Sequence, residues 1–170
     1  MQDDVVVVSE SEPAVLVEKV IQIDRINKVV SGGKRMAFRA FVISGDSRGN
    51  VGIGLGKSKE VPSAIRKGVN KAKNDMVTVH LKNGTLPHEV VGKFGASRVI
   101  LKPARPGTGV IAGGSVRILL ELAGFTDVVA KTWSNNSINS AKAALVALAK
   151  CKDLIEEERV RGRTLSVYRG

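Results

Sequence analysis

GGKRMAFRAFVISGDSRGNVGIGLGKSKEVPSAIRKG, residues 32–68, decides the fold of the first half of this 170-residue chain. Residues 38–43 are mostly apolar and favour a strand. After a turn at residues 45–50, residues 51–56 alternate with period two, so that Val, Ile and Leu share one face and only glycines lie on the other. Glycine weakens a strand, and three in alternation predict that another backbone or a helix packs closely against that face.

The same stretch ends in the start of a helix, and a further strand precedes it. Pro62 suits the first turn of a helix that we expect to run to about residue 73. Residues 20–30 are rich in Val and Ile, and Gly32-Gly33 separates them from the next strand, which predicts a β-hairpin. Three strands and one helix form a small α+β layer of order βββα.

The charge of the chain is concentrated in one part of it. The formal net charge is +11, but residues 1–24 carry −5 and residues 25–73 carry +10. A concentrated basic patch attracts polyanions, nucleic acid first and acidic membrane surfaces second. The charge pattern therefore indicates a nucleic-acid-binding protein.

Several polar and basic residues are candidates for RNA contacts. Two cations at a Gly-Gly tip would meet phosphates, because glycine lets a backbone come close to a ligand; an ordinary solvated turn is the alternative interpretation. Further cations lie at the strand-to-helix corner, on the helix and before a Pro- and Gly-rich loop, and two asparagines precede the last core helix. The candidates are Arg25, Lys28, Ser31, Gly32, Gly33, Lys34, Arg35, Lys57, Lys59, Arg66, Lys67, Lys102, Arg105, Asn135 and Asn136.

A second domain is predicted over residues 83–150. We expect strands at 87–93, 97–103 and 128–132, a helix from the N-cap Ser115 to Gly124, and an Ala-rich helix over 138–150. The order is ββαβα, a second α+β layer. Residues 1–17 are expected to be an acidic mobile tail, residues 18–82 the first domain, and residues 151–170 a terminal helix and tail.

Other function classes find less support. The chain contains one Cys, Cys151, and two His, which are too few ligands for a typical zinc site. No apolar run reaches the length of a membrane helix. Residues 106–115 resemble a phosphate-cradling loop ahead of a helix. They contain no P-loop Lys, however, and no well-placed carboxylate pair could hold Mg²⁺. A free-standing duplex-RNA-binding module and a small phosphotransferase remain the alternatives to a structural RNA-binding protein; no cofactor is expected.

Three segments together resemble one family. They are similar to the small-subunit ribosomal protein five family of bacteria and organelles. The segments are residues 32–68, residues 102–124 (KPARPGTGVIAGGSVRILLELAG) and residues 134–148 (SNNSINSAKAALVAL). The resemblance covers about residues 18–150. Ser44 departs from it, because an aliphatic residue is expected at that position of the second strand.

The resemblance implies a fold. It implies an N-terminal domain similar to double-stranded-RNA-binding domains and a C-terminal domain with a left-handed βαβ crossover. It also implies a structural constituent of the small subunit, not an enzyme, that supports assembly and translational accuracy. The expected location is the cytoplasm of a bacterium or, alternatively, the matrix of a plastid or mitochondrion.

The resemblance also implies partners and sites. The chain is expected to bind small-subunit ribosomal RNA near the decoding region, beside the channel through which messenger RNA enters, and to contact ribosomal proteins four and eight but no membrane. The hairpin tip, here Asn27, Lys28 and residues 31–35, would lie near the spectinomycin site. The interface with protein four would involve Gly107, Thr108, Gly109 and Arg117.

Overall fold

The structure of the chain, a computed structural model, describes residues 15–81, 83–152 and 154–162. The predicted tail at 1–17 and the C-terminal tail therefore lie largely outside the described residues, as does Lys82 at the predicted domain boundary. Described residues of both domains form α+β layers, as the sequence predicts. Among them, no helix combines the length and the apolar composition needed to cross a bilayer.

The N-terminal domain is an antiparallel sheet of order β1-β2-β3-β4 with one helix, α1 (Val61–Asn74), on one face. Its strands are β1 (Val17–Val30), β2 (Gly33–Gly45), β3 (Asn50–Ser58) and β4 (Met76–Thr78). The prediction of three strands was incomplete. Met76, which lies beyond the end of the predicted helix, begins the fourth strand and pairs with Gly52 of β3. A strand of three residues is too short to show a period in the sequence.

The C-terminal domain is a sheet of order β5-β6-β8-β7 covered on one side by two helices. Its elements are β5 (Val90–Phe94), β6 (Ser97–Pro103), β7 (Val110–Ile111), α2 (Gly114–Ala123), β8 (Val128–Thr132) and α3 (Ser137–Ala149), followed by α4 (Leu154–Arg161). The short β7 was not predicted. It pairs in parallel with β8, so α2 forms a βαβ crossover, whose left hand stays a prediction.

The helix ends follow local backbone chemistry. Gly124 ends α2 in the left-handed conformation, with φ of 98°, as predicted. The predicted N-cap Ser115 is wrong: the cap is Gly113, two residues earlier, and α2 begins at Gly114. One of the two asparagines that precede the last core helix is its cap: Asn136 Oδ1 accepts hydrogen bonds from the amides of Ile138 and Asn139 at 3.1 and 3.3 Å.

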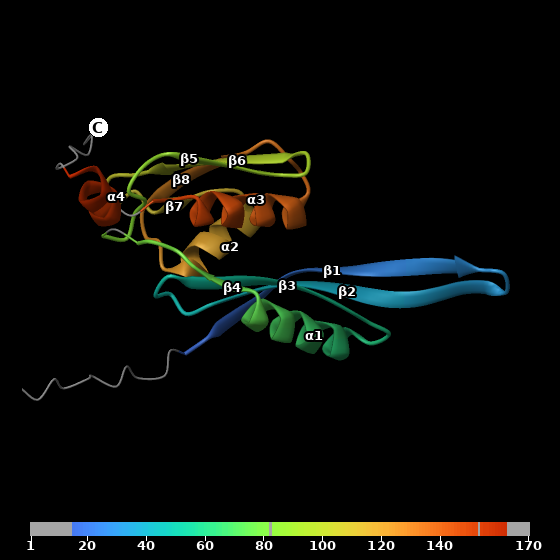
Figure 1. Ribbon diagram of the computed structural model, residues 1–170. Helices are drawn as coiled ribbons and strands as arrows, with labels where there is room; N and C mark the ends of the chain where they lie inside the picture. The colour runs from blue at the N-terminus through green and yellow to red at the C-terminus, as the bar shows by residue number, and fades with distance from the viewer. Residues whose placement is uncertain (1–14, 82, 153, 163–170) are drawn as a thin grey trace, which may run out of the picture.

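The larger of two hydrophobic core clusters in the described residues joins the two domains; the smaller lies between β2 and α1. In Figure 1 the layers follow one another as α1, the N-terminal sheet, the helices α2 and α3, and the C-terminal sheet. Phe41, Ile43 and Val51 of the first sheet belong to the same buried cluster as Leu119 and Leu120 of α2. The amides of Ser47 and Gly49 donate to the carbonyls of Leu122 and Ala123 at 2.9 and 3.0 Å. The domains therefore form one packed body.

The glycine face of β3 lies against α1, as the alternation predicts. A Cβ on Gly52, Gly54 or Gly56 would lie 2.0, 1.9 or 1.9 Å from a backbone carbonyl oxygen of the helix. The unusual Ser44 is fully buried, and its hydroxyl has no hydrogen-bond partner among the described residues.

Candidate nucleic-acid interface

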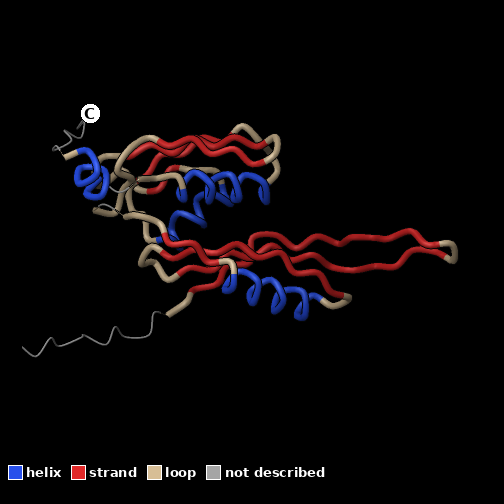
Figure 2. Tube along the Cα trace, in the orientation of Figure 1, coloured by secondary structure: helices blue, strands red, loops and turns tan. Residues whose placement is uncertain are grey.

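The hairpin of β1 and β2 extends beyond the rest of the sheet. Residues 38–45 of β2 pair with β3, whereas residues 33–37 pair only with residues 26–30 of β1. Residues 26–37 therefore form a two-stranded projection, here called the hairpin arm, which points away from both domains (Figure 2). Its loop is Ser31-Gly32, and a Cβ on Gly32 or Gly33 would meet no atom within 4 Å. The tip is open to a ligand.

The cations of the hairpin arm are unpaired. Lys28 lies directly opposite Arg35, and Lys34 lies opposite Val29. Like charges facing each other across a strand pair destabilise it, yet none of the three cations forms an ion pair within the described part of the chain. An anion from outside would relieve this repulsion.

The base of the arm distinguishes two arginines. Arg39 donates from Nε and Nη2 to Asp24 at 3.1 and 2.6 Å. The Arg39 hydrogen bonds, helped by Gln22, hold the pKa of Asp24 below its usual value. Arg39 is thus neutralised within the fold. Arg25 is exposed, and its Nε contacts the sulfur of Met36, so its charge remains available.

The strand-to-helix corner continues the basic surface. Lys57, Lys59 and Lys67 line a hollow of about 580 Å³ together with Ala37, Ser58, Glu60 and Ser63. Ala37 belongs to the hairpin arm, so arm and corner are contiguous. The hollow also contains the N-terminal end of α1, where free amide groups favour anions. The two serines were not predicted, although their position within the Lys-Ser-Lys and Pro-Ser runs was a signal.

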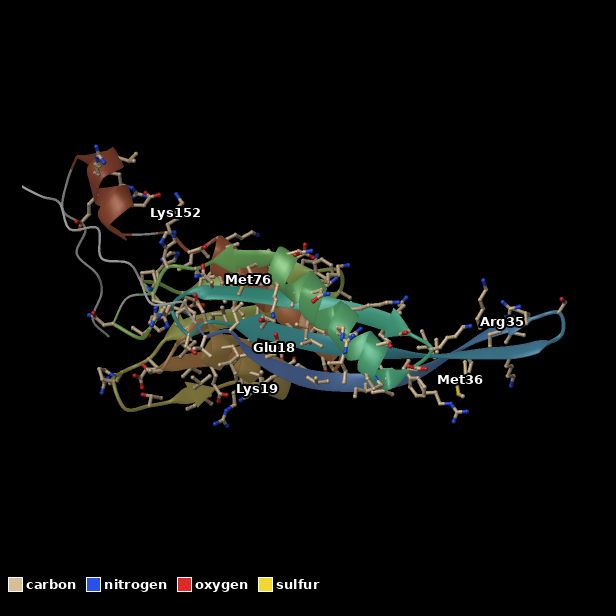
Figure 3. All side chains as sticks on the ribbon, turned by 90° about the horizontal axis from the view of Figure 1, so that it is seen from below. Glu18, Lys19, Arg35, Met36, Met76 and Lys152 are labelled. Carbon is tan, nitrogen blue, oxygen red and sulfur yellow. The ribbon has the colours of Figure 1, made fainter. Side chains whose placement is uncertain are left out.

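Two cations at the other end of this domain are paired. Lys73, in the last turn of α1, contacts Glu18 at 2.9 Å, and Lys19 contacts Glu121 of α2 at 3.6 Å. Figure 3 shows Glu18 and Lys19 near the middle of the molecule and Arg35 far out on the arm. Arg66, on α1 beside the corner, is exposed. The arm and the corner therefore bring together seven exposed cations that have no ion pair among the described residues: Lys28, Lys34, Arg35, Lys57, Lys59, Arg66 and Lys67.

The C-terminal candidates do not join this surface. Lys102 is paired with Glu89 at 3.2 Å. Arg105 is exposed, and its carbonyl accepts from the amide and hydroxyl of Thr108 at 3.1 and 2.7 Å. Asn135 is exposed, while the side-chain oxygen of Asn136 is committed to the helix cap. Their RNA contacts stay predictions.

The predicted protein-contact loop is held by one carboxylate. Gly107 and Gly109 have φ of 88° and 77° and face open space. The Gly109 amide donates to Asp127 Oδ1 at 2.9 Å, and this bond lowers the pKa of Asp127. Arg117, the fourth residue expected at this contact, is exposed on α2 and has a partner within its own helix. Its Nε contacts Glu121, one turn further on, at 2.8 Å, a favourable spacing for opposite charges.

These features define the class of the protein: a basic protein of two α+β domains that are joined by a shared core, with an exposed cationic arm suited to folded RNA. The residues include no cluster of His, Cys, Asp and Glu that could hold a metal within the described ranges. Comparison with known proteins agrees with that class. The model for the N-terminal domain of ribosomal protein S5 matches residues 16–80, and the model for its C-terminal domain matches residues 92–161.

Similar relatives cover nearly the whole chain. Small ribosomal subunit protein uS5 of Syntrophobacter fumaroxidans is 48% identical over 161 residues, 94% of this chain and 97% of the relative. The protein of the same name from Chloroflexus aurantiacus is 50% identical over 150 residues, 88% of this chain and 84% of the relative. The chain therefore belongs to the ribosomal protein S5 family, whose members are structural proteins and not enzymes.

Proposed function

We propose that the chain is a structural constituent of the small ribosomal subunit and binds its ribosomal RNA through the hairpin arm and the adjoining corner. The observation that carries this proposal is the opposition of Lys28 and Arg35, neither of which has an ion-pair partner among the described residues. Such a pair costs stability in the free protein. RNA phosphates offset that cost, and each neutralised phosphate releases counterions into the solvent.

The shape of the arm suits the interior of a folded RNA. Only two residues form its loop. Gly32 and Gly33 lie beside the cations in open space, so the backbone there can come close to sugar and phosphate groups. The tip bears Asn27, Lys28 and residues 31–35. We place it near the decoding region and the channel through which messenger RNA enters, as the family resemblance implies.

The second domain contributes a protein-contact surface in this proposal. Gly107, Thr108 and Gly109 form a loop with no cation among them, and Arg117 is exposed on the following helix. Such a loop suits a close fit to another protein, which the resemblance implies is ribosomal protein four. Ribosomal protein eight is the second proposed protein partner. The shared core fixes the second domain relative to the first. A structural protein of a large assembly needs this fixed arrangement, whereas a free-standing RNA-binding module does not need a second domain.

Sedimentation tests the proposal. A cell extract is resolved on a sucrose gradient, and the chain is followed by mass spectrometry beside the other small-subunit proteins. We expect it in the small-subunit and whole-ribosome fractions, in the same proportion as its neighbours. Recovery of most of the protein at the top of the gradient, free of ribosomal RNA, would contradict the proposed function.

A further inference from the structure

The C-terminal sheet has one face that no helix or strand of the described residues covers. The helices α2 and α3 lie on one side of it, and α4 lies beyond its end (Figure 1). Alternation along the strands identifies the residues of the other side: Gly92 of β5 faces α3, since a Cβ there would lie 2.0 Å from the Ala143 carbonyl oxygen, so Val91 and Lys93 face outward. We call this side the outer face.

Strand register arranges the outer face in rows. One row is Lys93 opposite Arg98, continued by Trp133, whose amide donates to the Arg98 carbonyl at 3.0 Å. The next row is Val91, Ile100 and Lys131. A third row is Lys102 opposite Val129. The outer face therefore presents four cations, of which Lys102 is paired with Glu89, and an indole around a small apolar centre.

On the outer face, the charges that have no ion-pair partner among the described residues are all positive. Strands β5, β6, β7 and β8 contain no acidic residue. The nearby carboxylate of Glu89 is occupied by Lys102 at 3.2 Å. Lys93, Arg98 and Lys131 have no ion pair with any described residue, and all three are exposed. A face of this kind complements a polyanion.

The exposed side chain of Trp133 indicates which kind of polyanion the outer face suits. It is 56% exposed, and the guanidinium of Arg98 lies 5.7 Å from the ring centroid. An exposed indole beside cations is the arrangement on which unpaired bases stack, while the cations follow the phosphates. Bases inside a duplex offer no free face for stacking, so the arrangement favours a single-stranded segment.

We propose that the outer face is a second RNA-contact surface, which binds an unpaired RNA segment with one base stacked on Trp133 and phosphates held by Lys93, Arg98 and Lys131. The proposal rests on the proposed function, since it adds a second contact with RNA, but it uses no residue of the hairpin arm. The two contacts can therefore fail separately.

Trp133 is the only tryptophan of the chain, so its fluorescence reports on the outer face alone. The probe is an unstructured single-stranded RNA of about 12 nucleotides, a length within the usual range of such sites, and a duplex of the same length is the comparison. We expect the single strand to quench the emission of the full chain and the duplex to quench it much less. The Lys34→Ala/Arg35→Ala variant should show the same quenching.

Variants identify the groups that bind. Lys93→Ala/Arg98→Ala/Lys131→Ala should lower the affinity for the single strand at least tenfold. The control Lys19→Ala/Lys73→Ala/Lys152→Ala removes the same charge from residues that already have carboxylate partners, and it should change affinity less than threefold. Trp133→Ala, measured by the anisotropy of labelled RNA, should lower affinity about fivefold or more. Circular dichroism checks that each variant is folded.

Three outcomes would overturn the proposal. One is absence of quenching by single-stranded RNA, and another is an equal reduction of affinity in the control triple variant. The third is that RNA leaves the Trp133 emission unchanged while other small-subunit proteins, added without RNA, quench it. That result would make the outer face a protein interface. The sedimentation of the chain with the small subunit is unaffected by any of these results, so the proposed function is tested independently.

Discussion

Gly54 of β3 lies so close to Gly68 of α1 that a Cβ on Gly54 would be 1.9 Å from the Gly68 carbonyl oxygen. Gly54→Ala must therefore push the helix away from the sheet. We expect the free energy of unfolding to fall by about 1–3 kcal/mol or more, the usual cost of overpacking, as measured by urea denaturation. Gly32→Ala is the matched control, because a Cβ there meets nothing within 4 Å and should change stability little. Equal stabilities of the two variants would contradict the close packing.

The sequence predicted this close approach because a strand face made only of glycines leaves space that a neighbouring helix or backbone must fill. It also predicted the long strands, α1 and the C-cap at Gly124, where period or turn chemistry is strong. It did not predict β4 and β7, which contain three and two residues and exist because neighbouring strands supply their hydrogen bonds. Short elements of this kind depend on tertiary contacts that no local pattern contains.

The candidate site was predictable where charge and glycine occur together in sequence, as at Lys34 and Arg35. The site was harder to predict where a side chain's partner comes from a distant part of the sequence. Nothing local shows that Lys102 is paired with Glu89 or that Arg98 lies over Trp133. The outer face was missed because its cations come from three strands that are separated in sequence.

The turn between β2 and β3, whose amides bond the end of α2 in the other domain, is held by the carboxylate of Asp46. Burial alone would raise its pKa, but hydrogen bonds from the Asn50 side chain and from the amides of Arg48 and Asn50 lower it overall. A carboxyl whose pKa is lower in the folded state stabilises the fold above its ordinary value of 3.8 and ceases to do so as the pH falls through the folded-state pKa.

Asp46→Asn should therefore lower the free energy of unfolding at pH 7 by about 1–3 kcal/mol. The difference from the wild type should shrink as the pH falls below about 4. Urea denaturation at several pH values measures both effects. Asp75→Asn, at an exposed position, is the control and should follow the wild type. A difference that is constant from pH 7 to pH 3 would show that the charge of Asp46 is not what matters.

Cys151 should be chemically inert in the native protein. It is 5% exposed, and burial raises its pKa to about 11 from 9.0. At pH 8 its thiolate fraction is then about a hundredfold lower than that of a thiol with the ordinary value, and the thiolate is the reactive form. Reaction with an aromatic disulfide reagent at pH 8 should be at least about a hundredfold slower in buffer than in denaturing urea. Similar rates in the two solutions would contradict the burial.

Arg117 tests the protein-contact surface of the second domain. Arg117→Leu leaves Glu121 with its second partner, Lys19, so we expect the fold and the affinity for ribosomal RNA to be nearly unchanged. Misreading of near-cognate codons should rise, because the substitution removes the cation from the proposed interface with ribosomal protein four. A reporter of misreading in cells measures this, with Glu121→Gln as the control for removal of the pairing within the helix. Wild-type misreading with reduced affinity for ribosomal RNA would make Arg117 an RNA ligand instead.

The central claim is that the hairpin arm binds RNA phosphates. The most direct measurement is the salt dependence of binding to small-subunit ribosomal RNA by the wild type and by Lys34→Ala/Arg35→Ala. Removing one phosphate-binding cation should reduce the slope of log K against log salt by about 0.9 on duplex-like RNA, so the double variant should reduce it by roughly 1.8. The control Lys19→Ala/Lys73→Ala removes the same charge from ion-paired residues and should keep the wild-type slope. A slope that is unchanged in the arm variant, or reduced equally in the control, would contradict the claim.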